Sequence, residues 1–141
     1  MKGKTIAELR EGDTAQLTKT VTQADILAFA EVSGDHNPLH VDPEKAAAGA
    51  FGGIVAHGML AAGLISAVIG MQLPGPGTVY LKQSLKFTKP VRPGDTVTAR
   101  VQVVALDPAK NRVSLRTTCL NHNGEVVLEG DALVKPPQGS F

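Results

Sequence analysis

The sequence has few aromatic side chains and almost no net charge. Aromatic residues make up 4% of its 141 residues, tryptophan is absent, and the formal net charge is +1. Lysine and arginine are scattered, so the sequence lacks both the basic patch and the stacking side chains that nucleic-acid binding requires. We therefore expect no nucleic-acid partner, and any binding pocket should be lined mainly by aliphatic side chains.

Cysteine is also scarce, because Cys119 is the only one in the sequence. One cysteine cannot form an intramolecular disulfide, and Cys119 lies in an alternating segment that is typical of a strand. The first eight residues contain no apolar stretch like that of a secretory signal. These absences predict a reduced, cytoplasmic protein.

Length and composition indicate one folded unit. The chain is long enough to close one hydrophobic core but not two. Its 43% of apolar and 19% of charged residues are ordinary values for a globular protein. We predict a single domain over residues 1–141.

The first third of the chain contains signals for a strand and a helix. Residues 14–20 alternate weakly between apolar and polar side chains, which predicts a strand. Thr22, followed three residues later by Asp25, is close to a capping box and predicts a helix that ends before Gly34.

The next segment, Asp35 to His40, is predicted to be a constrained loop. Pro38 has no N–H to donate and restricts Asn37 before it to extended conformations, which excludes regular helix here. Asp42–Pro43 then combines a capping residue with proline at the first helical position, so a second helix is predicted to begin there.

A run without formal charge extends from Ile54 to Leu73. Its length fits either a buried central helix or a membrane span. Glycine and proline flank the run, in place of the basic loops and aromatic belts of a typical span, and His57 and Ser66 lie inside it. We predict a central buried helix that begins around His57 and Gly58, and no membrane partner.

After Gly77 the periodicity changes to two, which is the period of strands. Four strands are predicted, over residues 78–88, 95–106, 112–121 and 125–135. Asn123–Gly124 is a strong hairpin signal, and consecutive hairpins give an antiparallel sheet with one apolar face to cover. The uncharged helix is available to cover it. The sequence therefore predicts an α+β protein with a single hot-dog fold, an antiparallel sheet wrapped around a central buried helix.

Asp35 and His40 are the candidate acid–base pair. They lie on one short loop stiffened by Pro38 and can converge on a small volume. Addition of water to an activated double bond needs a base for the water and an acid for the alpha carbon, and a histidine and a carboxyl group supply both. To donate a proton near neutral pH, Asp35 should be buried among apolar groups. The same residue types are also common in turns, so a purely structural loop stays open.

The start of the predicted central helix is a second candidate site. Free N–H groups and the positive end of the helix dipole lie there, and the N–H of Gly58 could stabilise the oxyanion of an enoyl thioester. Gly58 could equally serve close packing. Ser66 could line a pocket, although most serines within helices bond to a carbonyl one turn earlier. His57 is more typical of a structural histidine whose hydrogen bonds are satisfied.

The sequence gives little support for a metal site or a hydrolytic triad. His36 and His40 have the spacing of helical metal ligands, but Pro38 interrupts the helix that would bring them together, so we predict no metal. Ser33 or Ser66 could complete a hydrolytic triad, yet neither lies in a Gly-x-Ser-x-Gly elbow.

Two segments carry a family resemblance, residues 35–42 (Asp-His-Asn-Pro-Leu-His-Val-Asp) and residues 53–60 (Gly-Ile-Val-Ala-His-Gly-Met-Leu). Together they resemble the MaoC-like hydratases, especially the (R)-specific enoyl-CoA hydratases of the PhaJ type, which supply polyhydroxyalkanoate synthesis. The resemblance covers nearly the whole chain. It implies a homodimer with an acyl-CoA channel near the subunit interface and no cofactor, because CoA is part of the substrate.

The resemblance also implies a role for each matching residue. Asp35 and His40 match the catalytic pair, and Gly58 matches the residue whose amide holds the thioester oxygen. Ser66 matches a serine near the active site, while Asn37 matches a residue that shapes or supports the loop. We expect an (R)-specific enoyl-CoA hydratase. The alternatives are a 3-hydroxyacyl-ACP dehydratase, a hot-dog acyl-CoA thioesterase and a non-catalytic acyl-CoA-binding module. Which of Asp35 and His40 is the acid stays open.

Overall fold

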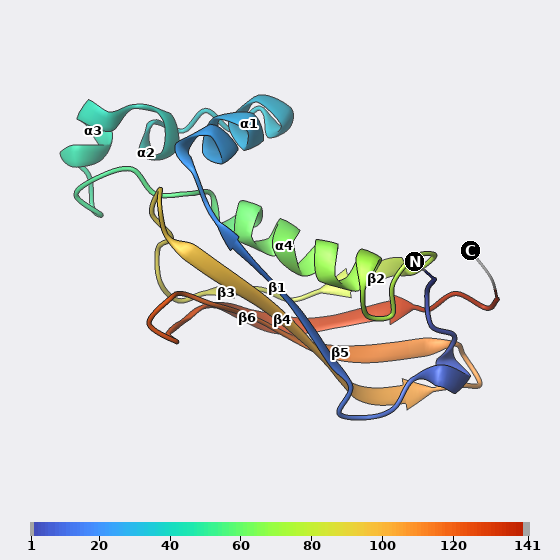
Figure 1. The fold of residues 1–141 in the computed structure, drawn as a ribbon. Coiled ribbons are helices and arrows are strands. Elements are labelled where there is room, and N and C mark those ends of the chain that lie inside the picture. Colours follow the sequence, from blue (N-terminus) through green and yellow to red (C-terminus); the bar gives the residue numbers. More distant parts are fainter. Residues whose placement is uncertain (1, 140–141) are drawn as a thin grey trace.

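A curved sheet and one long helix dominate the structure (Figure 1), a computed structural model that describes residues 2–139. Within these residues six strands form one antiparallel sheet in the order β1-β4-β5-β6-β2, and β3 also pairs with β6. The strands are β1 (Thr14–Thr20), β2 (Val79–Gln83), β3 (Lys86–Phe87), β4 (Thr96–Asp107), β5 (Arg112–Leu120) and β6 (Val126–Lys135). The helices are α1 (Gln23–Ser33), α2 (Pro38–Val41), α3 (Pro43–Ala47) and α4 (Gly58–Met71), with a short 3₁₀ turn η1 (Ile6–Glu8).

The core lies between α4 and the sheet. Buried and half-buried residues alternate along the whole of β5, as the period of two predicts, because one face of the strand packs on the helix. The helix contributes Leu60, Ala61, Ile65, Val68 and Ile69 to this core. The arrangement is the single hot-dog fold that the sequence predicts.

Local signals place the first helix as predicted. The hydroxyl oxygen of Thr22 accepts the N–H of Asp25 at 3.1 Å, and the carboxylate of Asp25 accepts the N–H of Thr22 at 2.9 Å. Gly34 ends α1 with a φ of 81°, a conformation that favours glycine. Asp42 likewise caps α3 by accepting the N–H of Lys45.

Two predictions about local structure are wrong. The expected single strand over residues 78–88 is divided into β2 and β3, because Ser84 bonds to Asp131 through both its hydroxyl and its main chain and lies against Gly130 of β6. The segment Asp35–His40 is also not entirely loop, since Pro38 begins the helical turn α2. Proline is tolerated there because the first helical N–H needs no partner within the helix.

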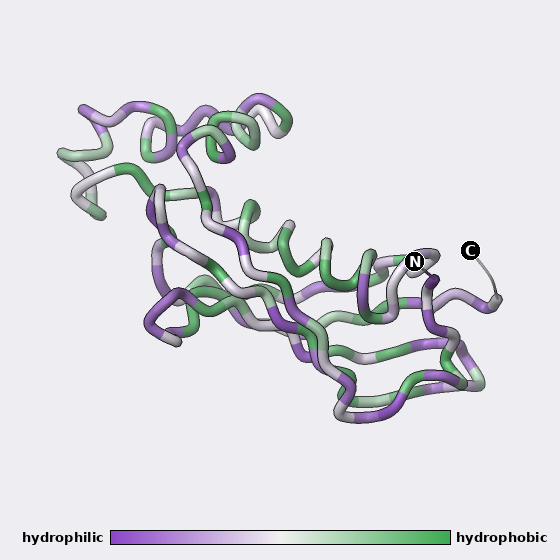
Figure 2. The backbone as a smooth tube through the Cα atoms, viewed as in Figure 1, coloured by the Kyte–Doolittle hydropathy of each residue, from purple (hydrophilic) through white to green (hydrophobic). Residues whose placement is uncertain are grey.

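The central helix is buried on one face only. Met59 and Met71 on α4 are 54% and 55% exposed, and Figure 2 shows hydrophobic residues on the side of α4 away from the sheet as well. The neighbouring edge strand β2 exposes Val79 and Leu81. Among the described residues, no helix combines the length and the hydropathy that crossing a bilayer requires. The expectation of a fully buried helix therefore does not hold for one chain alone.

The helices α1, α2 and α3 gather at the end of the molecule where α4 begins (Figure 1). The N–H of Val55 donates to the carbonyl oxygen of Leu39, which connects α2 to the extended segment 54–57. Arg92, in the segment before β4, donates to the carbonyl oxygen of Phe51 in the segment after α3. This placement brings the loop between α1 and α2 over the N-terminus of α4.

Candidate active site

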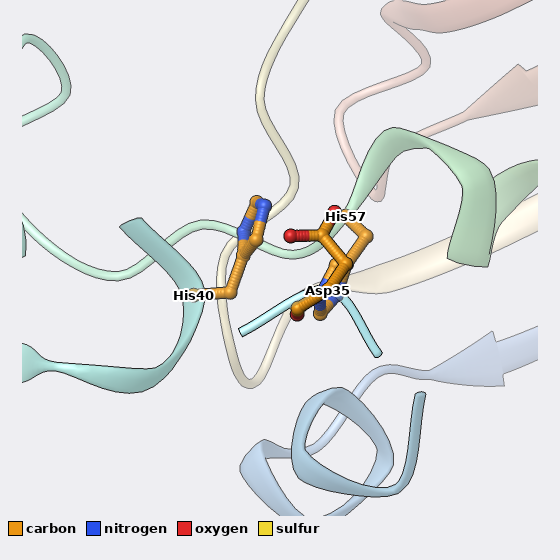
Figure 3. Close-up of side chains that lie close together, drawn as sticks. All are labelled: Asp35, His40 and His57. Carbon is orange, nitrogen blue, oxygen red and sulfur yellow. The ribbon is translucent and has the colours of Figure 1, made fainter. Parts of the chain in front are cut away.

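Three side chains converge at the N-terminus of α4. Asp35, His40 and His57 each offer an oxygen or nitrogen atom, and these atoms lie within 4.8 Å of one another. Figure 3 shows the carboxyl group of Asp35 pointing toward the ring of His40. The predicted convergence of Asp35 and His40 is present. His57 joins them, although the sequence favoured a purely structural histidine at this position.

Local hydrogen bonds shape the loop that holds Asp35. The N–H of Asp35 donates to the hydroxyl of Ser33 at 3.1 Å, and its carboxylate accepts the N–H of Asn37 at 3.2 Å. Asn37 in turn caps α2 by accepting the N–H of Leu39 at 3.1 Å. Asn37 therefore lies where a loop-shaping residue is expected. The side chain of Asp35 is exposed in the single chain, so the expected burial of this carboxyl group is not found.

His40 has one ring nitrogen bonded and one available. Its Nδ1 lies 2.6 Å from the carbonyl oxygen of Val55, in the extended segment before α4. Because a carbonyl oxygen only accepts, Nδ1 carries the proton and Nε2 of the neutral ring keeps its lone pair. This tautomer can accept a proton at Nε2, as a general base must.

His57 is buried beneath this pair, with 3% of its surface exposed. Its Nε2 lies 2.9 Å from the carbonyl oxygen of Asp35, and its ring packs at a tilt against the rings of His40 and Phe29. Among residues 2–139 its Nδ1 has no hydrogen-bond partner. The expectation of a structural histidine with satisfied hydrogen bonds is therefore only half met.

The arrangement of these side chains does not favour a shared metal ion. The rings of His40 and His57 have centroids 3.9 Å apart and planes inclined by 31°. One nitrogen of each ring, Nδ1 of His40 and Nε2 of His57, is already bonded to a carbonyl oxygen, which leaves only the other nitrogen of each ring for a metal. The absence of a metal remains a prediction.

Gly58 is the first residue of α4, and its predicted site is compatible with the structure. His57 is the N-cap residue, and within the described part of the chain its side chain makes no capping hydrogen bond to the first N–H groups of α4. A Cβ atom on Gly58 would lie 2.4 Å from Cε1 of Phe87. Close packing therefore also requires glycine here, as the alternative interpretation predicted.

A cavity of about 460 Å³ opens in front of these groups. Its wall includes His40, His57 and Gly58, and most of the rest is apolar, with Val91 and Leu128 among the aliphatic residues. The expected aliphatic pocket is present, although Phe51 and Phe87 add two aromatic rings. Ser66 is not part of this wall and lies exposed on α4 about two turns after Gly58, so the single chain does not bring it to the other groups.

Cys119 is unsuited to act as a nucleophile. It is buried in β5, and burial raises the pKa of its thiol to about 12. The thiol is therefore protonated at neutral pH, and the thiolate is the reactive form.

Comparison with known proteins agrees with this geometry. The family model described as "MaoC like domain" matches residues 7–124, which include Asp35, His40, His57 and Gly58. The chain belongs to the MaoC-like family. The MaoC-like chain is 52% identical to a Rhodospirillum rubrum protein named (R)-specific enoyl-CoA hydratase, over 92% of this chain and 90% of that one.

Two further similarities concern the fold and the acyl carrier. The solved structure of unliganded R-hydratase PhaJ1 from Pseudomonas aeruginosa superposes on this MaoC-like chain with a TM-score of 0.93 and 42% identity, covering 99% of this chain and 90% of that one. An Arabidopsis thaliana protein named mitochondrial 3-hydroxyacyl-[acyl-carrier-protein] dehydratase is also 42% identical, over 88% of this chain and 75% of the relative.

The contact between Gly58 and Phe87 can be tested by a double-mutant cycle. Gly58→Ala should lower the free energy of unfolding by about 1–3 kcal/mol, because its Cβ overlaps the phenyl ring of Phe87. In a Phe87→Ala background the ring is gone, so the same change should cost less than about 0.5 kcal/mol. Denaturant unfolding of the four proteins measures both values. An equal cost in the two backgrounds would show that the ring is not what excludes a side chain at residue 58.

Proposed function

We propose that this chain is an (R)-specific 2-enoyl-CoA hydratase, which adds water reversibly and syn across trans-2-enoyl-CoA to give (R)-3-hydroxyacyl-CoA. The observation that carries the proposal is the convergence of Asp35 with His40 and His57 at the N-terminus of α4, where His40 and Gly58 line one apolar cavity. The name and the high identity of the Rhodospirillum relative support the same activity. No cofactor is needed, because CoA is part of the substrate.

In the proposed mechanism His40 activates the water. The bond from Nδ1 to the carbonyl of Val55 leaves Nε2 to remove a proton from a water molecule in the cavity. The resulting hydroxide attacks the beta carbon, and the protonated carboxyl group of Asp35 delivers its proton to the alpha carbon. The proton that His40 took from water then passes to the Asp35 carboxylate and restores both groups. Both groups come from one short segment, so water and proton reach the same face of the planar enoyl group.

The N–H of Gly58 stabilises the charge that forms on the thioester oxygen. Attack at the beta carbon makes the thioester enolate-like, and a main-chain N–H at a helix N-terminus provides a preorganised donor with a favourable dipole. The phenyl ring of Phe87 lies close to Gly58 and forms part of the cavity wall, although both residues are exposed in the single chain. A donor from which bound substrate excludes water stabilises an oxyanion more strongly than a donor in water.

We propose that the active form is a homodimer whose second subunit completes the site. Strand β2 is a sheet edge, and both β2 and α4 expose apolar residues. An unpaired edge next to apolar side chains favours antiparallel pairing with a second copy. The second subunit would cover Ser66 and part of the acyl channel, and would remove solvent from Asp35.

A second candidate is the same chemistry on a different carrier. The Arabidopsis relative is named for a dehydratase that acts on acyl carrier protein, and the acid–base pair would serve hydration of a CoA ester and dehydration of a carrier-bound hydroxyacyl group equally. We propose CoA as the carrier, in the cytoplasm, with supply of polyhydroxyalkanoate precursors as the role.

The activity can be tested with crotonyl-CoA. A hydratase should reduce the enoyl absorbance without releasing free thiol, because the double bond is lost and the thioester is kept. Thiol release would identify a thioesterase, and binding without either change would leave an acyl-CoA-binding module. Parallel assays with a crotonyl carrier protein compare kcat/KM for the two carriers.

The product of the same assay tests the stereochemistry. An (S)-specific 3-hydroxyacyl-CoA dehydrogenase should not oxidise the product, and hydration in heavy water should place deuterium and hydroxyl on the same face. Anti addition would contradict delivery of both groups by one loop. Prompt oxidation by the (S)-specific enzyme would contradict the (R) assignment alone.

Removal of either acid–base group should abolish most of the activity. Asp35→Asn and His40→Gln should each lower kcat by about 10²–10⁴-fold, because each removes a group that transfers a proton. His122→Gln in the exposed turn between β5 and β6 is the matched control and should keep full activity. Near-normal turnover by a folded Asp35→Asn or His40→Gln protein would remove that residue from the mechanism.

The homodimer predicts a mass of about twice the 14.7 kDa of one chain in light scattering. Leu81→Lys on the exposed edge strand β2 should shift the protein toward monomer and lower activity, because it places a charge in the apolar interface. Arg100→Lys, exposed on β4, is the control. Full activity in a strictly monomeric wild-type protein would contradict the proposal.

A further inference from the structure

We propose that His57 is a positioning residue that sets the relation between Asp35 and His40, through its Nε2–H on one and its ring on the other. The inference deepens the proposed function and rests on it, because the two groups that His57 contacts are those proposed to move protons. His57 itself accepts or donates no proton in the reaction.

The first contact fixes the main chain of Asp35. Nε2 of His57 lies 2.9 Å from the carbonyl oxygen of Asp35, although the two residues are 22 positions apart in the sequence. Since the carbonyl oxygen only accepts, Nε2 carries a proton. The side chain of Asp35 is exposed and its remaining bonds are local, so this long-range bond ties its loop to the start of α4.

The second contact fixes the ring of His40. The ring of His57 lies between those of His40, with centroids 3.9 Å apart, and Phe29 of α1, with centroids 4.7 Å apart. One buried ring therefore contacts α1, the loop after it and α2. Figure 3 shows the three polar side chains meeting in front of the first turn of α4. The group that holds the loop is thus adjacent in sequence to Gly58, whose N–H is the proposed oxyanion donor.

The hydrogen bonding of His57 distinguishes positioning from proton transfer. With its proton on Nε2, the neutral ring has no proton on Nδ1, and this atom is buried without a partner among the described residues. The other neutral tautomer, with its proton on Nδ1, would lose the bond to the Asp35 carbonyl and bury a donor that has no acceptor among the described residues. The ring therefore keeps one tautomer and one orientation, which a positioning group requires.

Two substitutions separate the contacts. His57→Phe keeps a ring between Phe29 and His40 but removes the donor to Asp35, whereas His57→Gln keeps an N–H near the place of Nε2 and removes the ring. His57→Phe should lower kcat for crotonyl-CoA by about 10²-fold, because a loop displaced by about 1 Å misaligns the proton-transfer groups. KM should change by less than about threefold, since the cavity that binds the acyl chain is retained.

His57→Gln should restore part of the loss, with a kcat about tenfold above that of His57→Phe and about tenfold below that of the wild type. A wild-type kcat in either variant, or a His57→Gln protein no better than His57→Phe, would overturn the proposal. So would a rise in KM at constant kcat, which indicates a role in substrate binding. His122→Gln again controls for loss of a histidine.

Nitrogen-15 NMR of the histidines in the wild-type protein decides the hydrogen-bond arrangement without any variant. We expect the neutral ring of His57 to be the Nε2–H tautomer. A neutral ring with its proton on Nδ1 would overturn the proposal, including when His57→Phe fails to fold. A wild-type protein that does not hydrate crotonyl-CoA would instead overturn the proposed function, so the two failures are distinguishable.

Discussion

The packing of α4 on the sheet is the interaction on which the rest of the structure depends. Ile65 and Val68 are fully buried against β4 and β5, and burial of a side chain of this size contributes about 1.5–3 kcal/mol. Because the helix is held along its length, its N-terminus has a fixed position over one end of the sheet. The free N–H groups there, the loop from α1 to α2 and the cavity are all placed by this one packing.

The segment before α4 then orders the site. The carbonyl oxygen of Val55 accepts the bond from the ring of His40, and the ring of His57 donates to the carbonyl oxygen of Asp35. One short extended segment therefore holds both groups of the candidate acid–base pair. Each bond also selects a tautomer, since both acceptors are carbonyl oxygens.

Two features of the single chain are exposed to solvent. One face of α4 and the edge strand β2 present apolar residues to solvent, and the carboxyl group of Asp35 is not shielded. Apolar side chains at an unpaired strand edge favour pairing with a second copy, which is why the proposed homodimer is assigned to β2.

Much of this protein follows from local sequence. The capping pair of Thr22 and Asp25, the left-handed Gly34 and the period of two in β5 act over a few residues, so their outcome does not depend on distant partners. The proximity of Asp35 and His40 has the same origin, in a short loop that Pro38 stiffens. Tertiary structure alone decided the break of β2 from β3 at Ser84, the ring of Phe87 over Gly58, the exposure of Asp35 and the bond from His57 to the Asp35 carbonyl. The physical reason is that contacts between residues far apart in sequence depend on how the helix and sheet pack, and packing leaves no local periodicity or capping signal to detect.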